Sequence, residues 1–233
     1  MCGRNNQQGI VAGDFIVDRL KGSQIAILHD KGTFGQGLAD EVTAQLRKRG
    51  VKAALYEGIS RGDKDFGAFI TKLHAAKIDV IFFGGLHPDA GPLVRQVREK
   101  GLKDTAFVSG DGITTQDFVS AAGGAQYVDG VYMTFARDPR LLPEAKEAVE
   151  AFRKNGTELE GYTLHAYAAV QAMAAAFNGC KSSRSEGAAR WLASNPVPTV
   201  LGEASWNTKG DLTSAGFVVY RWDSEGKYQA LSG

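Results

Sequence analysis

The first 135 residues alternate between short apolar runs and longer segments that are apolar on one side only. An uninterrupted apolar run is typical of a strand buried on both faces of a sheet, whereas apolar residues spaced three and four positions apart indicate a helix. The predicted strands are 24–28, 51–56, 79–83, 105–108 and 130–134, and the predicted helices are 8–20, 33–49, 65–76, 88–100 and 115–122. This order predicts an α/β fold with a doubly wound parallel sheet, covered by helices on both faces.

Residues that commonly begin or end helices agree with these predicted bounds. Gly50 and Gly101 follow two of the helices, as expected of a residue that tolerates positive φ. Pro88 stands at the start of a helix, where its missing N–H group costs nothing. Thr33 precedes Gln36 by three positions, which predicts a capping box at the start of helix 33–49.

The pattern changes near Asp138 and Pro139, after which helices follow one another with hardly any strand between them. The predicted helices are 143–154, 162–177 and 186–193, and the predicted tail strands are 204–206, 216–222 and 227–231. The helices are apolar enough to pack on a sheet, yet this part of the chain offers no second series of alternating strands. We therefore divide the chain into 1–135, 136–200 and 201–233.

Three glycine-rich loops follow strands of the predicted sheet, at 29–34, 84–88 and 109–114. In open parallel α/β sheets the ligand lies outside the carboxyl ends of the strands, where the strand order reverses. The first two loops would flank that point if the strand order is 2-1-3-4. Glycine lets the backbone approach a ligand closely, so Gly85 is a candidate contact.

Three side chains on these loops are further candidates. Phe34 is interpreted as a ligand contact, or alternatively as a partly buried residue of the first helical turn. Leu86 is either a pocket wall or an exposed loop residue. Asp111 is either a turn former or the carboxylate that meets a ligand ammonium through a charge-assisted hydrogen bond. His87 and Asp30 are interpreted as a solvated residue and a loop or cap residue.

Composition and charge narrow the functional classes. Hydrophobic residues make up 43% and charged residues 23% of the chain, and the net charge is +1, so no overall field indicates nucleic acid binding. No apolar run is long enough to span a membrane, and the polar start contains no secretory signal. The two cysteines, Cys2 and Cys180, match neither metal nor redox spacing, and isolated thiols are favoured over a disulfide. The four histidines show no metal-ligand spacing, so no metal or cofactor is expected.

Enzyme motifs are weak. The glycine-rich segment 32–37 does not have the G-x-G-x-x-G spacing, and Glu57 is the nearest acidic residue for a ribose. There is no P-loop, nucleophile elbow or H-E-x-x-H motif. A Rossmann-type nucleotide-dependent enzyme nevertheless stays open as an alternative.

Several segments resemble the leucine/isoleucine/valine-binding proteins of ABC importers. They are GRNNQQG at 3–9, IAILHDKGTFGQG at 25–37, GDKDF at 62–66, FFGGLHPDAG at 82–91, YAAVQA at 167–172 and WNTKGDL at 206–212. The resemblance runs from about Gly3 to the C-terminus with few gaps. It implies a periplasmic protein with two Rossmann-like lobes, joined by three crossing strands, that closes on an amino acid.

The resemblance also assigns parts of the chain to the two lobes. Residues 1–135 look like most of the second lobe, a periplasmic-binding-protein type I lobe. Residues from about 138 to 200 look like an incomplete other lobe, made mainly of helices. The opening βα series of that lobe is expected to be missing, and with it the groups that grip the ligand's α-carboxylate.

Site residues can be carried over from the family only onto the second lobe. Phe34 stands where the family often has a tyrosine that covers the ligand side chain, and Leu86 stands where an aromatic residue is common. Asp111 stands where the branched-chain binders have a glutamate that meets the ammonium. The shorter acid keeps the charge and changes its reach by about one methylene.

The resemblance therefore implies a solute-binding component of an ABC importer that performs no chemistry, with a small amino acid and the transporter permease as partners and no nucleic acid. We expect this chain alone to bind weakly or not at all, because one lobe supplies only half of the polar contacts. A ligand-sensing module of a receptor or regulator with the same fold is an alternative. The apolar helices within 143–177 predict a homo-oligomer that covers them.

Overall fold

The structure is a computed structural model that describes residues 1–181 and 184–231. It separates the chain into two compact units. The sheet unit consists of Arg4–Phe135 together with the chain from Phe217 onward, and the helical unit consists of Met1–Gly3 and Ala136–Gly216. The chain passes from one unit to the other at three places, after Gly3, after Phe135 and after Gly216.

The sheet unit contains a seven-stranded sheet in the order β2-β1-β3-β4-β5-β8-β9. The strands are β1 (Ile25–His29), β2 (Leu55–Gly58), β3 (Val80–Gly84), β4 (Ala106–Ser109), β5 (Tyr132–Ala136), β8 (Phe217–Trp222) and β9 (Tyr228–Ala230). The pairs β1–β2, β1–β3, β3–β4 and β4–β5 are parallel, and β8–β9 is antiparallel. The first four strands have the order 2-1-3-4, the order under which the first two loops flank the switch point, so the strand order reverses between β1 and β3.

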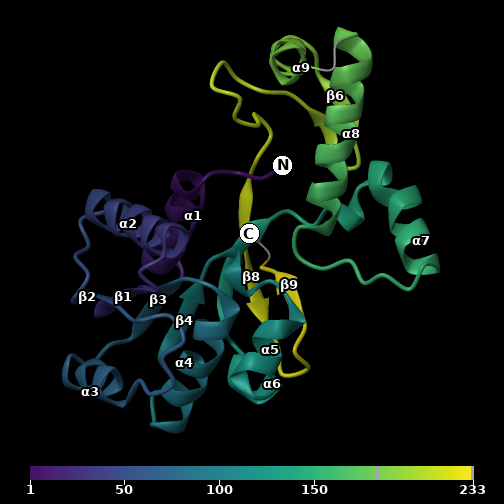
Figure 1. Cartoon of the computed structure of the whole chain (residues 1–233). Helices are drawn as coiled ribbons and strands as arrows, with labels where there is room; N and C mark the ends of the chain where they lie inside the picture. The colour runs from purple at the N-terminus through teal and green to yellow at the C-terminus, as the bar shows by residue number, and fades with distance from the viewer. Residues whose placement is uncertain (182–183, 232–233) are drawn as a thin grey trace. The chain divides into compact units, whose positions relative to one another are not determined.

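Helices cover both faces of this sheet, as the sequence predicts. They are α1 (Asn5–Asp18), α2 (Thr33–Lys48), α3 (Gly67–Ala75), α4 (His87–Glu99), α5 (Gln116–Ala122) and α6 (Ala125–Val128). Figure 1 shows α1 and α2 on one side of the strands and α3, α4 and α5 on the other.

The core of the sheet unit follows from the alternation of side chains along its strands. Ile25, Ile27 and Phe82 point to the face of α1 and α2, where they form one buried cluster with residues of both helices. The next residue along β3, Phe83, points the other way and lies 6.5 Å from the ring of Phe107, measured between centroids. Both faces of the central strands are therefore buried, which explains why the apolar runs of these strands are uninterrupted.

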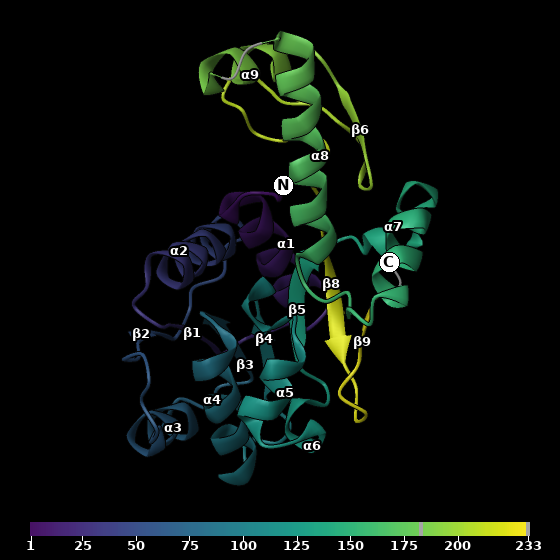
Figure 2. The ribbon, with the colours of Figure 1, turned by 45° about the vertical axis from the view of Figure 1, so that its right-hand side comes forward.

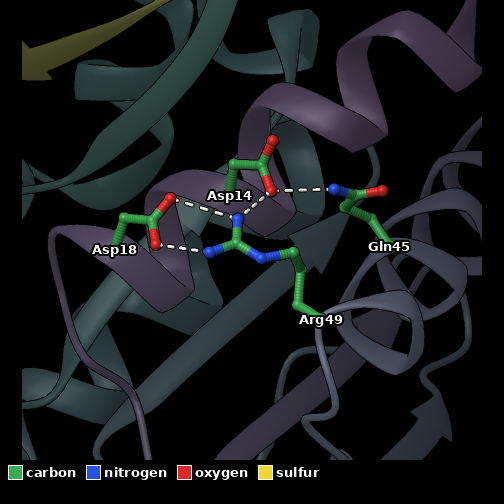
Figure 3. A network of polar contacts seen from close by, with 4 residues as sticks. All are labelled: Asp14, Asp18, Gln45 and Arg49. Atoms are coloured by element: carbon green, nitrogen blue, oxygen red, sulfur yellow. Dashed lines mark hydrogen bonds and ion pairs between the residues drawn. The ribbon is translucent and has the colours of Figure 1, made fainter.

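A polar network joins α1 to α2 (Figure 3). The Arg49 guanidinium, just beyond the end of α2, contacts the carboxylates of Asp14 and Asp18 on α1. Gln45 Nε2 donates to Asp14 Oδ1 over 2.7 Å. The ion pairs of Arg49 are exposed to solvent, so they fix the alignment of the two helices and add little stability.

The helical unit has little sheet. It contains α7 (Lys146–Lys154), α8 (Thr163–Cys180) and α9 (Ser185–Leu192), preceded by 3-10 turns at Pro139–Leu141 and Pro143–Ala145. A hairpin of β6 (Val197–Thr199) and β7 (Gly202–Ala204) completes it. The Val200 N–H donates to Gln171 Oε1 of α8 over 2.9 Å, which fastens the hairpin to this helix.

The long helix α8 is drawn in green in Figures 1 and 2. Its side chains divide into a buried side and an exposed side. Leu164, Ala168, Ala172 and Ala176 are buried at intervals of four residues. Large apolar side chains on the same helix are exposed to solvent, namely those of Tyr167, Val170, Met173 and Phe177. The helical unit therefore buries only one of the two apolar sides of α8.

Several predicted bounds need correction. Thr33 is the first residue of α2 rather than its cap, because Gly32 is the N-cap and its N–H donates to Asp30 Oδ1 over 2.8 Å, so the predicted capping box is absent. The strand predicted at 51–56 is displaced to Leu55–Gly58, since its pairing with β1 begins at Leu55. The strand Val197–Thr199 was not predicted, because Pro198 within it argues against a strand.

The division of the chain differs from the predicted one in its tail. Residues 201–216 belong to the helical unit and residues 217–231 to the sheet unit, so the predicted segment 201–233 is shared between the two. Its last two residues lie outside the described residues. The change of unit after Phe135 falls at the predicted end of the first segment.

Candidate functional site

The candidate site is formed by the loops that leave β1, β3 and β4. His29 pairs with Gly84, and Phe83 pairs with Ser109, so the three strands end at the same edge of the sheet. All four sequence-predicted site residues lie at this carboxyl edge. Phe34 is the second residue of α2, Gly85 and Leu86 join β3 to α4, and Asp111 begins a 3-10 turn after β4.

Glycines bring these loops into backbone contact. A methyl group on Gly84 would lie 2.1 Å from the carbonyl oxygen of Gly35, and one on Gly112 would lie 2.1 Å from that of Gly85. Neither position could hold a larger residue without movement of the backbone. The three predicted loops are therefore packed against one another.

Asp111 is held by contacts on both its carboxylate and its backbone. The Gln8 side-chain amide of α1 donates to Asp111 Oδ1 over 3.0 Å, and the Thr114 hydroxyl donates to the Asp111 carbonyl over 3.0 Å. The side chain of Asp111 is half-buried. A carboxylate fixed in this way presents a defined direction to a cation, as recognition of an ammonium group requires.

Two apolar side chains flank the same edge. Phe34 is partly buried and packs against the cluster under α1 and α2. Leu86, the N-cap of α4, keeps 43% of its surface exposed. An exposed leucine beside a fixed carboxylate leaves apolar surface available for a ligand side chain.

Two buried carboxylates fasten the neighbouring loop that follows β2. Asp30, at the end of β1, accepts from Arg61 Nε over 2.9 Å and from the Gly32 N–H over 2.8 Å. Asp89, in the first turn of α4, accepts from the Gly62 N–H over 2.7 Å. The predicted loop role of Asp30 agrees with these contacts. The buried carboxylates of Asp30 and Asp89 thus hold the loop after β2 in place beside the candidate site.

Two titratable groups near the start of this edge have altered pKa values. Burial lowers the pKa of His29, whose Nδ1 accepts from the Lys31 N–H over 3.1 Å. Burial raises the pKa of Tyr56 to about 12, and its hydroxyl also donates to Asp40. Both groups are therefore neutral near pH 7, so the charges at this start of the edge are those of Asp30, Lys31 and Arg61.

The helical unit contains a separate small cavity of about 130 Å³. It is lined by Met1, Cys2, Gly3, Ala136, Arg137, His165, Leu201, Leu212, Ser214, Ala215 and Gly216. Burial lowers the pKa of His165 to about 4, helped by the positive charge of the Met1 amino group. None of the predicted site residues lines this cavity.

Residues 1–181 and 184–231 have neither a cluster of metal ligands nor a membrane-spanning helix. No group of three or more His, Cys, Asp or Glu side chains that could hold a metal ion occurs there. None of the helices in that part of the chain has both the length and the apolar character needed to cross a bilayer. Cys2 and Cys180 are not joined by a disulfide.

Gln8 is the residue of this site that sequence reasoning missed. It lies on the buried side of α1, together with Ala12, Phe15 and Ile16. A glutamine at a core-facing helical position is a signal, because a buried amide needs partners. The identity of those partners could not be read from the sequence, since Asp111 is 103 positions away.

A family model described as "Periplasmic binding protein" matches residues 3–227. An "Amino acid binding protein" of Pseudomonas aeruginosa is 56% identical over 231 residues, which are 99% of this chain and 62% of that relative. The "Leu/Ile/Val-binding protein homolog 1" of Brucella suis is 46% identical, again over 99% of this chain and 62% of the relative. The chain thus spans about 62% of the length of these curated relatives.

Solved structures share the fold. A leucine-binding protein of Thermotoga maritima superposes with a TM-score of 0.89 at 21% identity, covering 99% of this chain and 66% of that protein. A branched-chain amino acid transporter substrate-binding protein of Streptococcus pneumoniae, solved with isoleucine, gives a TM-score of 0.81 at 22% identity and covers 100% of this chain and 66% of that protein. The predicted α/β fold, with a largely parallel sheet, is confirmed.

Proposed function

Because this chain belongs to the periplasmic binding protein family, we propose that it takes part in solute binding and that the carboxyl edge of the sheet unit contacts an amino acid. The observation that carries the proposal is the fixed carboxylate of Asp111, held by Gln8 beside the packed loops of β1 and β3. In this role Asp111 accepts a charge-assisted hydrogen bond from the ligand ammonium. Gly85 offers backbone to the ligand, and Phe34 and Leu86 offer apolar surface.

The proposed ligand is a branched-chain or similar small amino acid. The names of the Brucella suis relative and of the Streptococcus pneumoniae structure support this class. The chemistry of the edge agrees, since one carboxylate and two apolar side chains match an ammonium group and an aliphatic side chain. No acidic side chain other than Asp111 is among the proposed contacts.

The proposed role is delivery of the ligand to an ABC importer in the periplasm, without chemistry on the ligand. The named relatives are binding proteins, which supports a role other than catalysis. The partner in this role is the importer's permease. A sensor module would use the same site, so amino acid uptake by cells with and without the protein distinguishes the two roles.

The test is isothermal titration of the purified chain with a panel of amino acids, beginning with leucine, isoleucine and valine. Saturable binding that is lost in Asp111→Ala supports the proposal. The matched control is Asp104→Ala, because Asp104 is an exposed carboxylate at the opposite end of the same strand. Equal loss in both variants, or undiminished binding in Asp111→Ala, contradicts the role of Asp111.

We expect the affinity of this chain alone to be low. The sheet unit supplies a partner for the ammonium, whereas a buried α-carboxylate needs donors of its own, at a cost of roughly 2–7 kcal/mol if one polar group stays unsatisfied. Saturable fluorescence changes with NAD or NADP, in place of amino acid binding, would instead support a nucleotide-dependent enzyme.

The homo-oligomer expected from the sequence stays a prediction. The exposed apolar side of α8 supports it, since apolar patches on a surface favour association. Sedimentation of the chain over a range of concentrations tests it, and a single monomeric species throughout contradicts it. Replacement of Val170 by Asp should shift any oligomer toward monomer.

A further inference from the structure

Gln8 makes two hydrogen bonds with a single nitrogen atom. Its Nε2 donates to Asp111 Oδ1 over 3.0 Å and to the backbone carbonyl of Thr134 over 2.9 Å. An amide nitrogen has two N–H groups, so both are used. The side chain is 1% exposed, and water therefore cannot replace either bond.

The two acceptors lie in different parts of the sheet unit. Asp111 follows β4 at the candidate site, whereas Thr134 lies in β5, just before the chain leaves the sheet unit after Phe135. Gln8 itself lies in the first turns of α1, just after the chain enters the sheet unit at Arg4. One buried amide therefore connects the candidate ligand carboxylate to two of the three places where the chain passes between the units.

The surroundings of this amide leave it little freedom. A methyl group on Gly110 would lie 3.1 Å from Gln8 Nε2 and 2.4 Å from Leu38 Cδ2. The Gln8 side chain thus passes beside a backbone position that has no room for a side chain. Movement of Asp111 toward a ligand therefore requires that Gln8 or β5 moves with it, or that one of the two hydrogen bonds breaks.

We propose that Gln8 is a positioning residue, which orients the Asp111 carboxylate for the ligand ammonium and transmits its displacement to the end of β5. The inference rests on the proposed function, because it takes Asp111 as the ammonium contact. It goes beyond the proposed function because Gln8 itself touches no ligand. Gln8 nevertheless affects recognition of the ammonium, and it couples ligand binding to the segments where the chain passes between the units.

The first test compares two ligands in the purified chain by NMR titration, which detects weak binding. Leucine carries the ammonium, and the matching 2-hydroxy acid carries a hydroxyl in its place. Gln8→Leu should weaken leucine binding about tenfold, the effect of losing one hydrogen bond to a charged group, and should change binding of the hydroxy acid much less. A structural defect would weaken both ligands equally, and that result would overturn the proposal.

The matched control is Gln45→Leu. Gln45 is also buried, lies on α2, and donates through Nε2 to Asp14 rather than to any candidate site residue. We expect the control to keep the wild-type ratio of the two affinities. If Gln8→Leu does not fold, Gln8→Met serves instead, because its unbranched side chain is of similar length and has no N–H or O–H group to donate to either acceptor.

The second test needs no ligand and separates failure of this inference from failure of the proposed function. Hydrogen–deuterium exchange in Gln8→Leu should accelerate together at residues 110–114 and 132–136, and less or not at all in Gln45→Leu. If the wild-type chain binds no amino acid, yet exchange in Gln8→Leu accelerates in both segments, the proposed ligand is wrong and the coupling stands. Unchanged exchange in both segments overturns the coupling, whatever the chain binds.

Discussion

The sheet unit and the helical unit use their apolar residues in opposite ways. In the sheet unit, strands such as Ile25–His29 and Val80–Gly84 are buried along their whole length between two layers of helices. In the helical unit, α8 buries small alanines and leaves Val170 and Met173 exposed by 60% and 50%. Its cluster is formed by α7, α8 and the hairpin, without a large sheet between them.

This difference shows that apolar content alone does not make a core. A helix buries its apolar side only where another layer is present to receive it. The sheet unit has both layers within the chain and gains roughly 1.5–3 kcal/mol for each large apolar side chain that it buries fully. The helical unit gains this for fewer residues, so we expect its free energy of unfolding to be lower.

The largest expected effect comes from removing one phenylalanine ring from each unit. Phe82 is fully buried in the centre of the sheet, whereas Phe152 is only partly buried against the cluster of the helical unit. Phe82→Ala should lower the free energy of unfolding by about 3–5 kcal/mol, because it leaves a cavity in a rigid core. Phe152→Ala should cost much less. Denaturant unfolding followed by Trp222 and Trp191 fluorescence measures the two, and equal losses would remove the distinction.

A methyl group at Gly84 tests how tightly the loops of the candidate site are packed. Gly84→Ala places a carbon 2.1 Å from the Gly35 carbonyl oxygen, so we expect a loss of about 1–3 kcal/mol from overpacking. Gly216→Ala in the helical unit is the control, since no atom lies within 4 Å of its added carbon. Thermal unfolding compares the variants, and similar melting temperatures would show that the loops can move apart.

Acid should affect the helical unit through His165. Its pKa is about 4 in the folded protein and 6.5 in its reference state, so the unfolded chain binds the extra proton between these values. Stability is therefore fully present above pH 6.5 and is lost as the pH falls toward 4, by on the order of 3 kcal/mol.

Replacement of His165 by Asn should flatten this part of the pH profile. His74→Asn, at an exposed position of the sheet unit, should leave it unchanged. Hydrogen exchange within α8, recorded at several pH values, gives the measurement. A profile that keeps its slope in His165→Asn would assign the acid sensitivity to other groups, such as Asp138, whose charge opposes the shift.

The smallest effect on stability is expected on the exposed side of α8. Val170→Ser should change the free energy of unfolding by less than about 0.5 kcal/mol, because the side chain already meets solvent. Ala172→Ser, on the buried side of the same helix, should cost more, since it buries a hydroxyl group. A large loss in Val170→Ser would mean that this side is covered.

The sequence predicted the alternation of the sheet unit and the position of Phe34, Leu86 and Asp111 beside strand ends. These features follow from local patterns, since apolar runs and glycines act over a few residues. The start of α2 was misread, because Gly32 is the N-cap and the Gln36 N–H, which a capping Thr33 hydroxyl would have bound, donates to the Gly32 carbonyl instead. The role of Gln8 was missed because its acceptors come from distant parts of the chain.

The sequence by itself determined which segments are helices and which are strands, because the spacing of apolar residues differs between the two. It also determined the edge of the sheet where the loops of β1, β3 and β4 meet, because parallel strands all end at the same edge. The tertiary structure decided which side of α8 stays exposed and which acceptors the Gln8 amide reaches. Both depend on surfaces that only come together after the strands pair and the helices pack. A buried amide forms hydrogen bonds with whichever acceptors lie near it in space, and the distance along the chain does not predict which residues those are.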